Sequence, residues 1–141
     1  GDVIKFSGDA LTILFEATDD YALHSSPCGS PEACVKTPLQ LACLRASACC
    51  IEIHKRLYNF HVGEGGVRLM LHIGVGAGNV TILRVGGVRN RFEYVLAGAP
   101  MAQIAIAQLL AGSGETVLSP QAWHEVSYTA IEGDPLEDGP F

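Results

Sequence analysis

The chain has 141 residues, of which 48% are hydrophobic and 17% charged, and its formal net charge is −6. This composition indicates one modest folded domain rather than a disordered segment, and the acidic balance argues against a general nucleic-acid-binding protein. No stretch of about 18 uncharged apolar residues occurs, so we expect no membrane span in this segment.

The first part of the chain has the pattern of a β-hairpin. Residues 3–6 and 10–15 are apolar runs that predict two strands, and Ser7-Gly8-Asp9 between them is typical of a tight turn. The chain does not begin with Met and this strand pattern starts almost at once, so we expect it to be a piece of a longer protein. Residues 16–38 then lose periodicity and predict a long surface loop.

A helix is predicted from residue 38 to about residue 60, where apolar side chains recur every three or four positions. Thr37 is a suitable N-cap, and Pro38 suits the first helical position. The remaining elements follow in chain order: strand 67–77, a Gly78-Asn79 turn to a hairpin partner at 80–85, strand 92–96, helix 101–110, strand 116–118 and helix 121–126.

The resulting order, β-β-α-β-β-β-α-β-α, predicts an α+β fold with one antiparallel sheet and helices packed on one face. No repeat or composition shift indicates a second domain. We therefore expect a single domain over residues 1–131, followed by a tail or the start of a linker at 132–141.

The five cysteines are odd in number, lack a Cys-x-x-Cys pair and do not have the spacing of a zinc site. We expect them to be buried free thiols in a cytoplasmic protein. Cys28 and Cys34 fall in the predicted loop and are the only pair of cysteines for which we would test redox behaviour.

Three residues are candidates for chemistry. Asp9 would be an exposed carboxylate on a rigid turn, which suits a hard cation such as Mg²⁺, although a Gly-Asp turn needs no function and one carboxylate cannot hold two metals. Lys5 is expected on the strand face opposite Ile4 and Phe6, where a lysine is usually just solvated. His72 lies in an apolar strand, where a histidine is more often structural than a ligand.

The glycines of "IGVGAGNV" are similar to a phosphate-binding loop only superficially. They lack the strand-loop-helix context and the Lys-Ser/Thr ending of that motif. We interpret them as strand and turn glycines.

Four segments together resemble the catalytic domain of the class III nucleotidyl cyclases. They are "GDVIKFSGDALTILFE", "LHIGVGAGNV", "YVLAGAPMAQIAIAQ" and "VLSPQAWHEV". The first resembles the second and third strands of that domain, whose hairpin tip carries a metal-binding Asp. Together the segments look most like the first of the two cyclase domains of the bicarbonate-responsive soluble adenylyl cyclases. The combination of "KFSGDAL" with "VLSP" at the matching spacing is the specific part of this signal. The resemblance covers about residues 1–131 and implies a ferredoxin-like, N-terminally truncated version of the cyclase fold.

The resemblance also implies a mechanism. Two such domains pair head to tail and bind ATP at their interface, where two Asp residues of one domain hold two Mg²⁺ or Mn²⁺ ions. The ribose 3′-oxygen then attacks the α-phosphorus in line, which gives cyclic AMP and pyrophosphate by two-metal catalysis. The protein would thus act in intracellular signalling as a phosphorus-oxygen lyase, with a second cyclase domain as partner.

Carried over residue by residue, the resemblance makes Asp9 one metal ligand, whereas the other Asp would lie upstream of Gly1. His72 stands where the family has Arg or Lys reaching the phosphates, and a neutral imidazole is a weaker partner there. Lys5 matches a lysine at the degenerate second site where bicarbonate binds. Ala105 replaces the arginine expected to help hold that anion, so the sequence departs from the bicarbonate-responsive pattern.

The transition-state Asn and Arg of the family are replaced by Ala102 and Ile106. This fits a metal-donating domain that takes those groups from its partner, and it implies that the isolated fragment is inactive. A catalytically silent cyclase-homology domain, serving regulation or dimerisation, is the alternative. An unrelated α+β binding domain with an ordinary Gly-Asp turn is a third reading, and the choice between ATP and GTP stays open.

Overall fold

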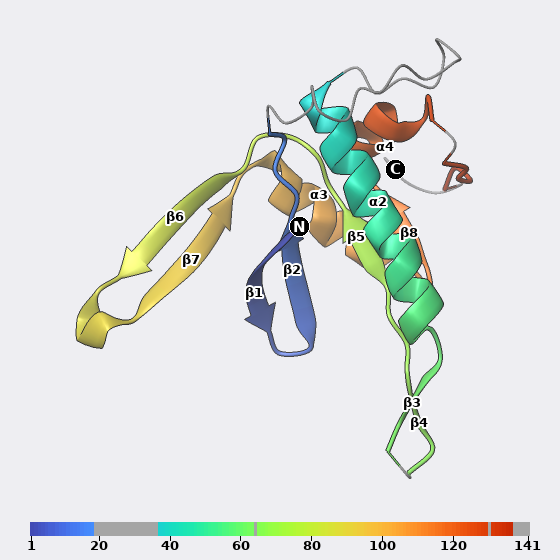
Figure 1. Ribbon diagram of the computed structural model, residues 1–141, viewed down its shortest axis with the longest axis horizontal. Coiled ribbons are helices and arrows are strands. Elements are labelled where there is room, and N and C mark those ends of the chain that lie inside the picture. The colour runs from blue at the N-terminus through green and yellow to red at the C-terminus, as the bar shows by residue number, and fades with distance from the viewer. Residues whose placement is uncertain (19–36, 64, 130, 137–141) are drawn as a thin grey trace.

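A computed structural model describes residues 1–18, 37–63, 65–129 and 131–136, and it confirms the α+β class (Figure 1). The long loop predicted at 16–38, with Cys28 and Cys34, falls mostly outside the described residues. The elements are β1 (Asp2–Ser7), β2 (Ala10–Leu14), α2 (Pro38–Leu57), β3 (Phe60–Val62), β4 (Val67–Leu69), β5 (Ile73–Val75), β6 (Thr81–Gly86), the 3-10 turn η1 (Val88–Asn90), β7 (Phe92–Ala97), α3 (Ala99–Leu110), β8 (Thr116–Leu118) and α4 (Pro120–Val126).

The body of the protein is built around β5, which pairs in parallel with β8. Helix α3 lies against one side of β5, because a Cβ at Gly74 would come within 2.8 Å of the Gln108 backbone nitrogen and one at Gly76 within 2.8 Å of the Pro100 carbonyl oxygen. These glycines therefore let a helix approach the strand closely. This accounts for the glycines of the "IGVGAG" segment without a phosphate-binding role.

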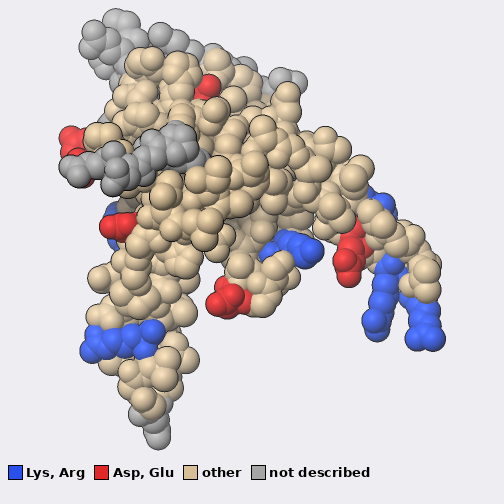
Figure 2. All heavy atoms as spheres, turned by 180° about the vertical axis from the view of Figure 1, so that it is seen from behind, with Lys and Arg blue, Asp and Glu red and all other residues tan. Residues whose placement is uncertain are grey.

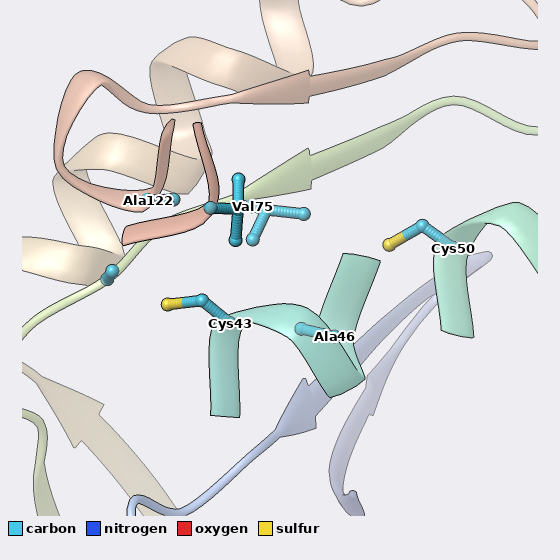
Figure 3. Packing of buried hydrophobic residues seen from close by; sticks show 7 residues of the cluster. Cys43, Ala46, Cys50, Val75 and Ala122 are labelled. Carbon is cyan, nitrogen blue, oxygen red and sulfur yellow. The ribbon is translucent and has the colours of Figure 1, made fainter. Parts of the chain in front are cut away.

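The opposite side of β5 packs on α2 and α4. Val75 belongs to a buried cluster with Cys43, Ala46 and Cys50 of α2 and Ala122 of α4 (Figure 3). The side chains in this cluster are small, so the helices lie close to the strand and each buried methyl group contributes about 0.8 kcal/mol. The core is thus a compact contact between one strand and two helices.

A polar link holds the end of β5 to the helices on both sides. The Gln103 side-chain oxygen on α3 accepts hydrogen bonds from the Ala77 backbone N–H at 2.9 Å and from the Ser119 hydroxyl at 2.8 Å. Ser119 is fully buried, and its hydroxyl also accepts from the Ala122 N–H as the N-cap of α4. The Gln103 oxygen and the Ser119 hydroxyl therefore make hydrogen bonds within the protein in place of those to water.

The predicted start of the long helix is confirmed. Thr37 accepts a hydrogen bond from the Gln40 N–H at 3.1 Å, and the Gln40 side chain accepts from the Thr37 N–H at 3.2 Å. This reciprocal pair is a capping box, with Pro38 at the first helical position. The helix ends at Leu57, three residues before the predicted end, because the chain leaves the helix at Tyr58 and then enters β3.

The sheet differs from the prediction. In place of one antiparallel sheet, the described strands form four two-stranded sheets, and the β5–β8 pair is parallel. The run predicted as strand 67–77 is divided into β4 and β5, and β4 pairs with β3, a strand that the periodicity did not indicate. The segment at 80–85 pairs with β7 rather than with 67–77. Helices also lie on both sides of β5, not on one face.

Two of these differences have a physical cause in the glycines. Gly78 and Gly98 both have φ above 130°, and a Cβ at Gly98 would come within 2.4 Å of the Asn79 carbonyl oxygen. The chain therefore turns away from β5 at this point and forms the β6–β7 hairpin, whose register runs from Thr81–Ala97 to Gly86–Phe92. A Gly-Asn pair predicts a turn, but it does not decide which strand the next segment joins.

Three hairpins project from this body: β1–β2, β3–β4 and β6–β7 (Figure 1). Each carries exposed large apolar side chains, among them Phe6 (74% exposed) and Val67 (62%), and Val88 at the tip of the β6–β7 hairpin is 80% exposed. Isolated two-stranded hairpins are marginally stable in water. The hairpins are therefore of the kind that is stabilised by packing against another surface. Among the described residues, no helix is both long and apolar enough to cross a membrane.

The expected burial of free thiols is confirmed for Cys43 and Cys50, whereas Cys49 on the same helix is only half-buried. Burial, reinforced by the charge of Glu125 at Cys43 and by Cys49 at Cys50, raises the pKa of each buried thiol from 9.0 to about 11. A raised pKa means that the unreactive neutral thiol persists at higher pH in the folded protein than in the unfolded chain.

We predict slow alkylation of these two thiols in the folded protein. At pH 8, a pKa of about 11 rather than 9.0 leaves about 100-fold less thiolate. Iodoacetamide labelling of Cys43 and Cys50, followed by peptide mass spectrometry, should therefore be at least that much slower in the native parent protein than in urea. The labelling rate should keep rising up to about pH 11. Equal rates in native and unfolded protein would contradict this prediction.

Candidate functional site

The turn between β1 and β2 presents Asp9 as expected, on a loop of only two residues. Ser7 pairs with Ala10, so Gly8 and Asp9 alone connect the strands. Gly8 has φ of 63°, a conformation that glycine adopts without the steric cost of a Cβ. Asp9 is exposed. A short, defined turn therefore holds a carboxylate away from the protein surface, which is the geometry in which a carboxylate can bind a hard cation.

Lys5 lies on the same hairpin, four residues before Asp9, and its side chain is exposed. A bulge interrupts the ladder here: Val3 pairs with Ile13 but Lys5 pairs with Thr12, so Ile4 is the extra residue. Because a bulge changes the direction of the following side chains, the simple alternation expected from sequence does not describe β1. Ile4 is half-buried and Phe6 is exposed.

His72 immediately precedes β5, in the break that separates β4 from β5, and its side chain is exposed. It thus lies at the start of the central strand rather than inside a long one. A side chain in this position is accessible to an anion, whereas a histidine buried in a strand would not be. No hydrogen bond or ion pair joins Asp9, Lys5 and His72 to one another among the described residues.

The described residues contain no group of three His, Cys, Asp or Glu side chains that could hold a metal ion. The donor chemistry of Asp9 fits Mg²⁺, since hard cations prefer carboxylate oxygen. One carboxylate is nevertheless too few for a bound ion.

Helix α3 presents an apolar face to solvent. Ala102, Ala105 and Ile106, which the sequence resemblance matches to anion-binding and transition-state positions, are all exposed on this helix. Leu109 on the same side is 86% exposed. A row of exposed apolar side chains along a helix is typical of a contact surface and not of a catalytic one.

Charged side chains gather at the far end of the β6–β7 hairpin, where Figure 2 shows a basic group. The sequence of this end contains Arg84, Arg89 and Arg91. The Arg84 guanidinium lies 3.9 Å from the centre of the Phe92 ring, a cation–π contact that orders one of these arginines. Arg84 falls in the strand predicted at 80–85, and Arg89 and Arg91 fall between that strand and the one predicted at 92–96; the sequence analysis gave these arginines no role.

A hollow of about 390 Å³ lies where β5 ends, between the start of α2 and α4. It is lined by Leu39, Ala77, Gly78, Pro120, Gln121, His124 and Glu125. Sequence analysis placed these positions in predicted helices, a strand and a turn, and it did not indicate a cavity. The side chains proposed for chemistry, Asp9, Lys5 and His72, do not line it.

Comparison with known proteins finds similarity over nearly the whole chain. Adenylate cyclase type 10 of Mus musculus is 27% identical over 138 residues, which are 98% of this chain and 7% of the mouse protein. The proteins of the same name from Oryctolagus cuniculus and Homo sapiens are 26% and 25% identical over the same share of this chain. No family model and no solved structure matches.

These matches show that the chain is similar to adenylate cyclases, and they confirm the resemblance inferred from the sequence motifs. The particular proteins that the chain is similar to are adenylate cyclases of type 10. The chain spans about 7% of the length of these relatives. It therefore corresponds to a small part of proteins of that kind.

Proposed function

We propose that residues 1–131 are the metal-donating half of an adenylyl cyclase, which converts ATP to cyclic AMP and pyrophosphate at the interface of two domains. The observation that carries the proposal is the exposed carboxylate of Asp9 on its two-residue turn. Similarity to adenylate cyclases over 98% of the chain supports it. The adenylate specificity rests on the names of those relatives.

In this proposal the residues of the chain have distinct roles. Asp9 would hold Mg²⁺ or Mn²⁺ together with a second carboxylate from outside the described residues. Two such ions, when bound, supply positive charge that stabilises the pentavalent phosphorus and the 3′-oxyanion. His72 would donate a hydrogen bond to a phosphate oxygen, and its effect would be stronger when the imidazole is protonated. Lys5 would contribute positive charge to an anion site.

The partner in this proposal is a second cyclase domain. The apolar face of α3, which includes Ala102, Ile106 and Leu109, would pack against it together with the projecting hairpins. Burial of these exposed side chains would stabilise the pair by the hydrophobic effect. Since Ala102 and Ile106 cannot contact a transition state by hydrogen bonds, the partner would supply the Asn and Arg. Bicarbonate would bind weakly or not at all, because Ala105 offers no charge.

A second candidate is a silent cyclase-homology domain that pairs with a partner and performs no chemistry. Ala105 and His72 favour this alternative, because they stand where the resemblance leads us to expect charged side chains. The exposed Asp9 opposes it, since the resemblance matches this carboxylate to a metal ligand.

The full-length parent protein decides between the two candidates. It should form cyclic AMP from ATP in the presence of Mg²⁺ or Mn²⁺, and the product should disappear when the metal is chelated. Parallel reactions with GTP measure the nucleotide preference. A folded, dimer-competent parent protein that forms neither cyclic nucleotide with either metal would support the silent domain and overturn the enzyme.

A further inference from the structure

The far end of the β6–β7 hairpin concentrates positive charge in an acidic chain. Arg84, Arg89 and Arg91 are three of the nine Lys and Arg residues of the sequence, and all three are exposed. Residues 65–92 contain no Asp or Glu, although the chain has 15 of them and a net charge of −6. These arginines form no ion pair among the residues that the structure describes. Their charge is therefore directed at solvent (Figure 2).

The turn that carries these arginines is closed by backbone hydrogen bonds. The Gly87 N–H donates to the Arg91 carbonyl at 2.8 Å, and the Arg91 N–H donates to the Val88 carbonyl at 3.1 Å. At the end of the strands, the Arg84 guanidinium lies over the Phe92 ring, 3.9 Å from its centre. The turn therefore presents its charges from a defined loop, which loses little conformational entropy when a partner binds.

The apex of this turn is apolar and exposed. Val88 is 80% exposed, and Val85 and Phe92, which flank the turn, are 52% and 43% exposed. An apolar apex beside guanidinium groups fits the boundary of a bilayer, where apolar side chains enter the acyl layer and long basic side chains reach the lipid phosphates. Single-stranded nucleic acid is instead bound by stacking of its bases on aromatic rings, and Arg84 already occupies one face of the Phe92 ring. The apex therefore favours a lipid surface.

The hairpin holds this end away from the rest of the protein (Figure 1). Its strands have 6 residues each, and strands of that length extend about 20 Å, roughly twice the Debye length at physiological ionic strength. The net negative charge of the chain is therefore largely screened at the turn, and the local arginines determine what it attracts. Glu93, the nearest acidic residue in the sequence, pairs with Val85 and so lies on the face of the hairpin opposite Arg84.

We propose that the end of the β6–β7 hairpin, residues 84–92, binds the surface of membranes that contain anionic lipids. Val88 enters the outer part of the acyl layer, and Arg89 and Arg91 contact the negatively charged headgroups. Each arginine near such a surface strengthens binding about fivefold, so a single hairpin gives weak and reversible attachment. The proposal concerns only the end of the hairpin, and it leaves the strands free to pack against a partner domain. It does not depend on catalysis.

Co-sedimentation of the full-length parent protein with vesicles tests the proposal. The vesicles consist of phosphatidylcholine alone or of phosphatidylcholine with about 30% phosphatidylserine, and only the second kind should bind the protein. Arg89→Gln/Arg91→Gln should lower the partition coefficient onto these vesicles by about 25-fold, because two positive charges are removed. The matched control is Lys55→Gln/Arg68→Gln, which removes two exposed positive charges from α2 and β4 and should change the coefficient by less than about twofold.

A second pair of variants tests the apolar apex. Val88→Ser should lower the partition coefficient by about fivefold, because a buried apolar side chain is replaced by a polar one. Val67→Ser is its control, since Val67 is 62% exposed on the β3–β4 hairpin and should not affect binding. Val88→Ser protein that binds like the wild type, with binding still lost in the arginine variant, means that the contact is electrostatic only and overturns the insertion of the apex.

Three results would overturn the lipid partner. They are no binding to either kind of vesicle, equal binding to both kinds, and equal losses in the arginine variant and its control. Retention on immobilised poly-glutamate that Arg89→Gln/Arg91→Gln abolishes, without vesicle binding, assigns the arginines to an acidic protein instead. The test is separable from the proposed function: vesicle binding without cyclase activity refutes only the enzyme, and cyclase activity without vesicle binding refutes only the lipid surface.

Discussion

Asp9→Asn in the full-length parent protein should lower cyclic AMP formation by at least about 100-fold at saturating Mg²⁺. Asn keeps the size of Asp9 and suits the same turn, but it removes the negative charge that attracts a divalent cation. The strands on either side of the turn should keep their register, because Gly8 and not Asp9 has the positive φ. Steady-state rates across a Mg²⁺ titration measure the loss. Excess Mn²⁺ should recover part of the activity if metal affinity is the property that changed.

Asp2→Asn is the matched control for this variant. Asp2 is an exposed carboxylate on the same hairpin, but it pairs with Leu14 at the end of the hairpin that is remote from the turn. Its replacement removes the same charge and should leave the rate unchanged. Equal activity of wild type and Asp9→Asn, with the wild type active, would mean that the metals bind elsewhere. Equal losses in both variants would indicate a general effect of charge.

Gly74→Val should destabilise the folded domain by about 3 kcal/mol. A Cβ at Gly74 would lie 2.8 Å from the Gln108 nitrogen and 2.9 Å from the Ile104 carbonyl oxygen, and both are backbone atoms of α3 that cannot rotate away. The helix would have to move off β5, which would also disturb the contact of Ala107 with this strand. Pulse proteolysis of the parent protein in urea should show a lower midpoint for cleavage of this segment.

Gly65→Val provides the comparison. A Cβ at Gly65 meets no atom within 4 Å, and its backbone is not in the left-handed region. The midpoint should therefore stay within experimental error of the wild type. A Gly74→Val protein as stable as the Gly65→Val protein would show that α3 does not pack on β5 as described.

The Asp9 turn is the part of the candidate site that the sequence predicted best. A two-residue turn is a local structure, so the residues Ser7 to Ala10 are enough to define it. The same holds for the start of α2, where Thr37, Pro38 and Gln40 set the cap among themselves. Both features depend on hydrogen bonds between residues that are neighbours in the chain.

Strand pairing was predicted less well, and the reason is equally physical. The segment after Gly78 has the composition of a strand, but its partner is chosen by the packing of α3 on Gly74 and Gly76 and by the turn at Gly98. These contacts join residues far apart in the sequence, for example Gly74 with Gln108 and Gly98 with Asn79, and no local periodicity indicates them. The division of 67–77 at His72 likewise depends on the β3–β4 hairpin.

The sequence by itself determined the α+β class, the helix caps, the turn that presents Asp9 and the resemblance to the nucleotidyl cyclases, because each follows from local chemistry or from short motifs. Only the tertiary structure decided that β5 lies between helices on both sides and that it pairs in parallel with β8. These properties follow from close packing between distant segments, in which the absence of a side chain at Gly74 matters as much as any side chain present.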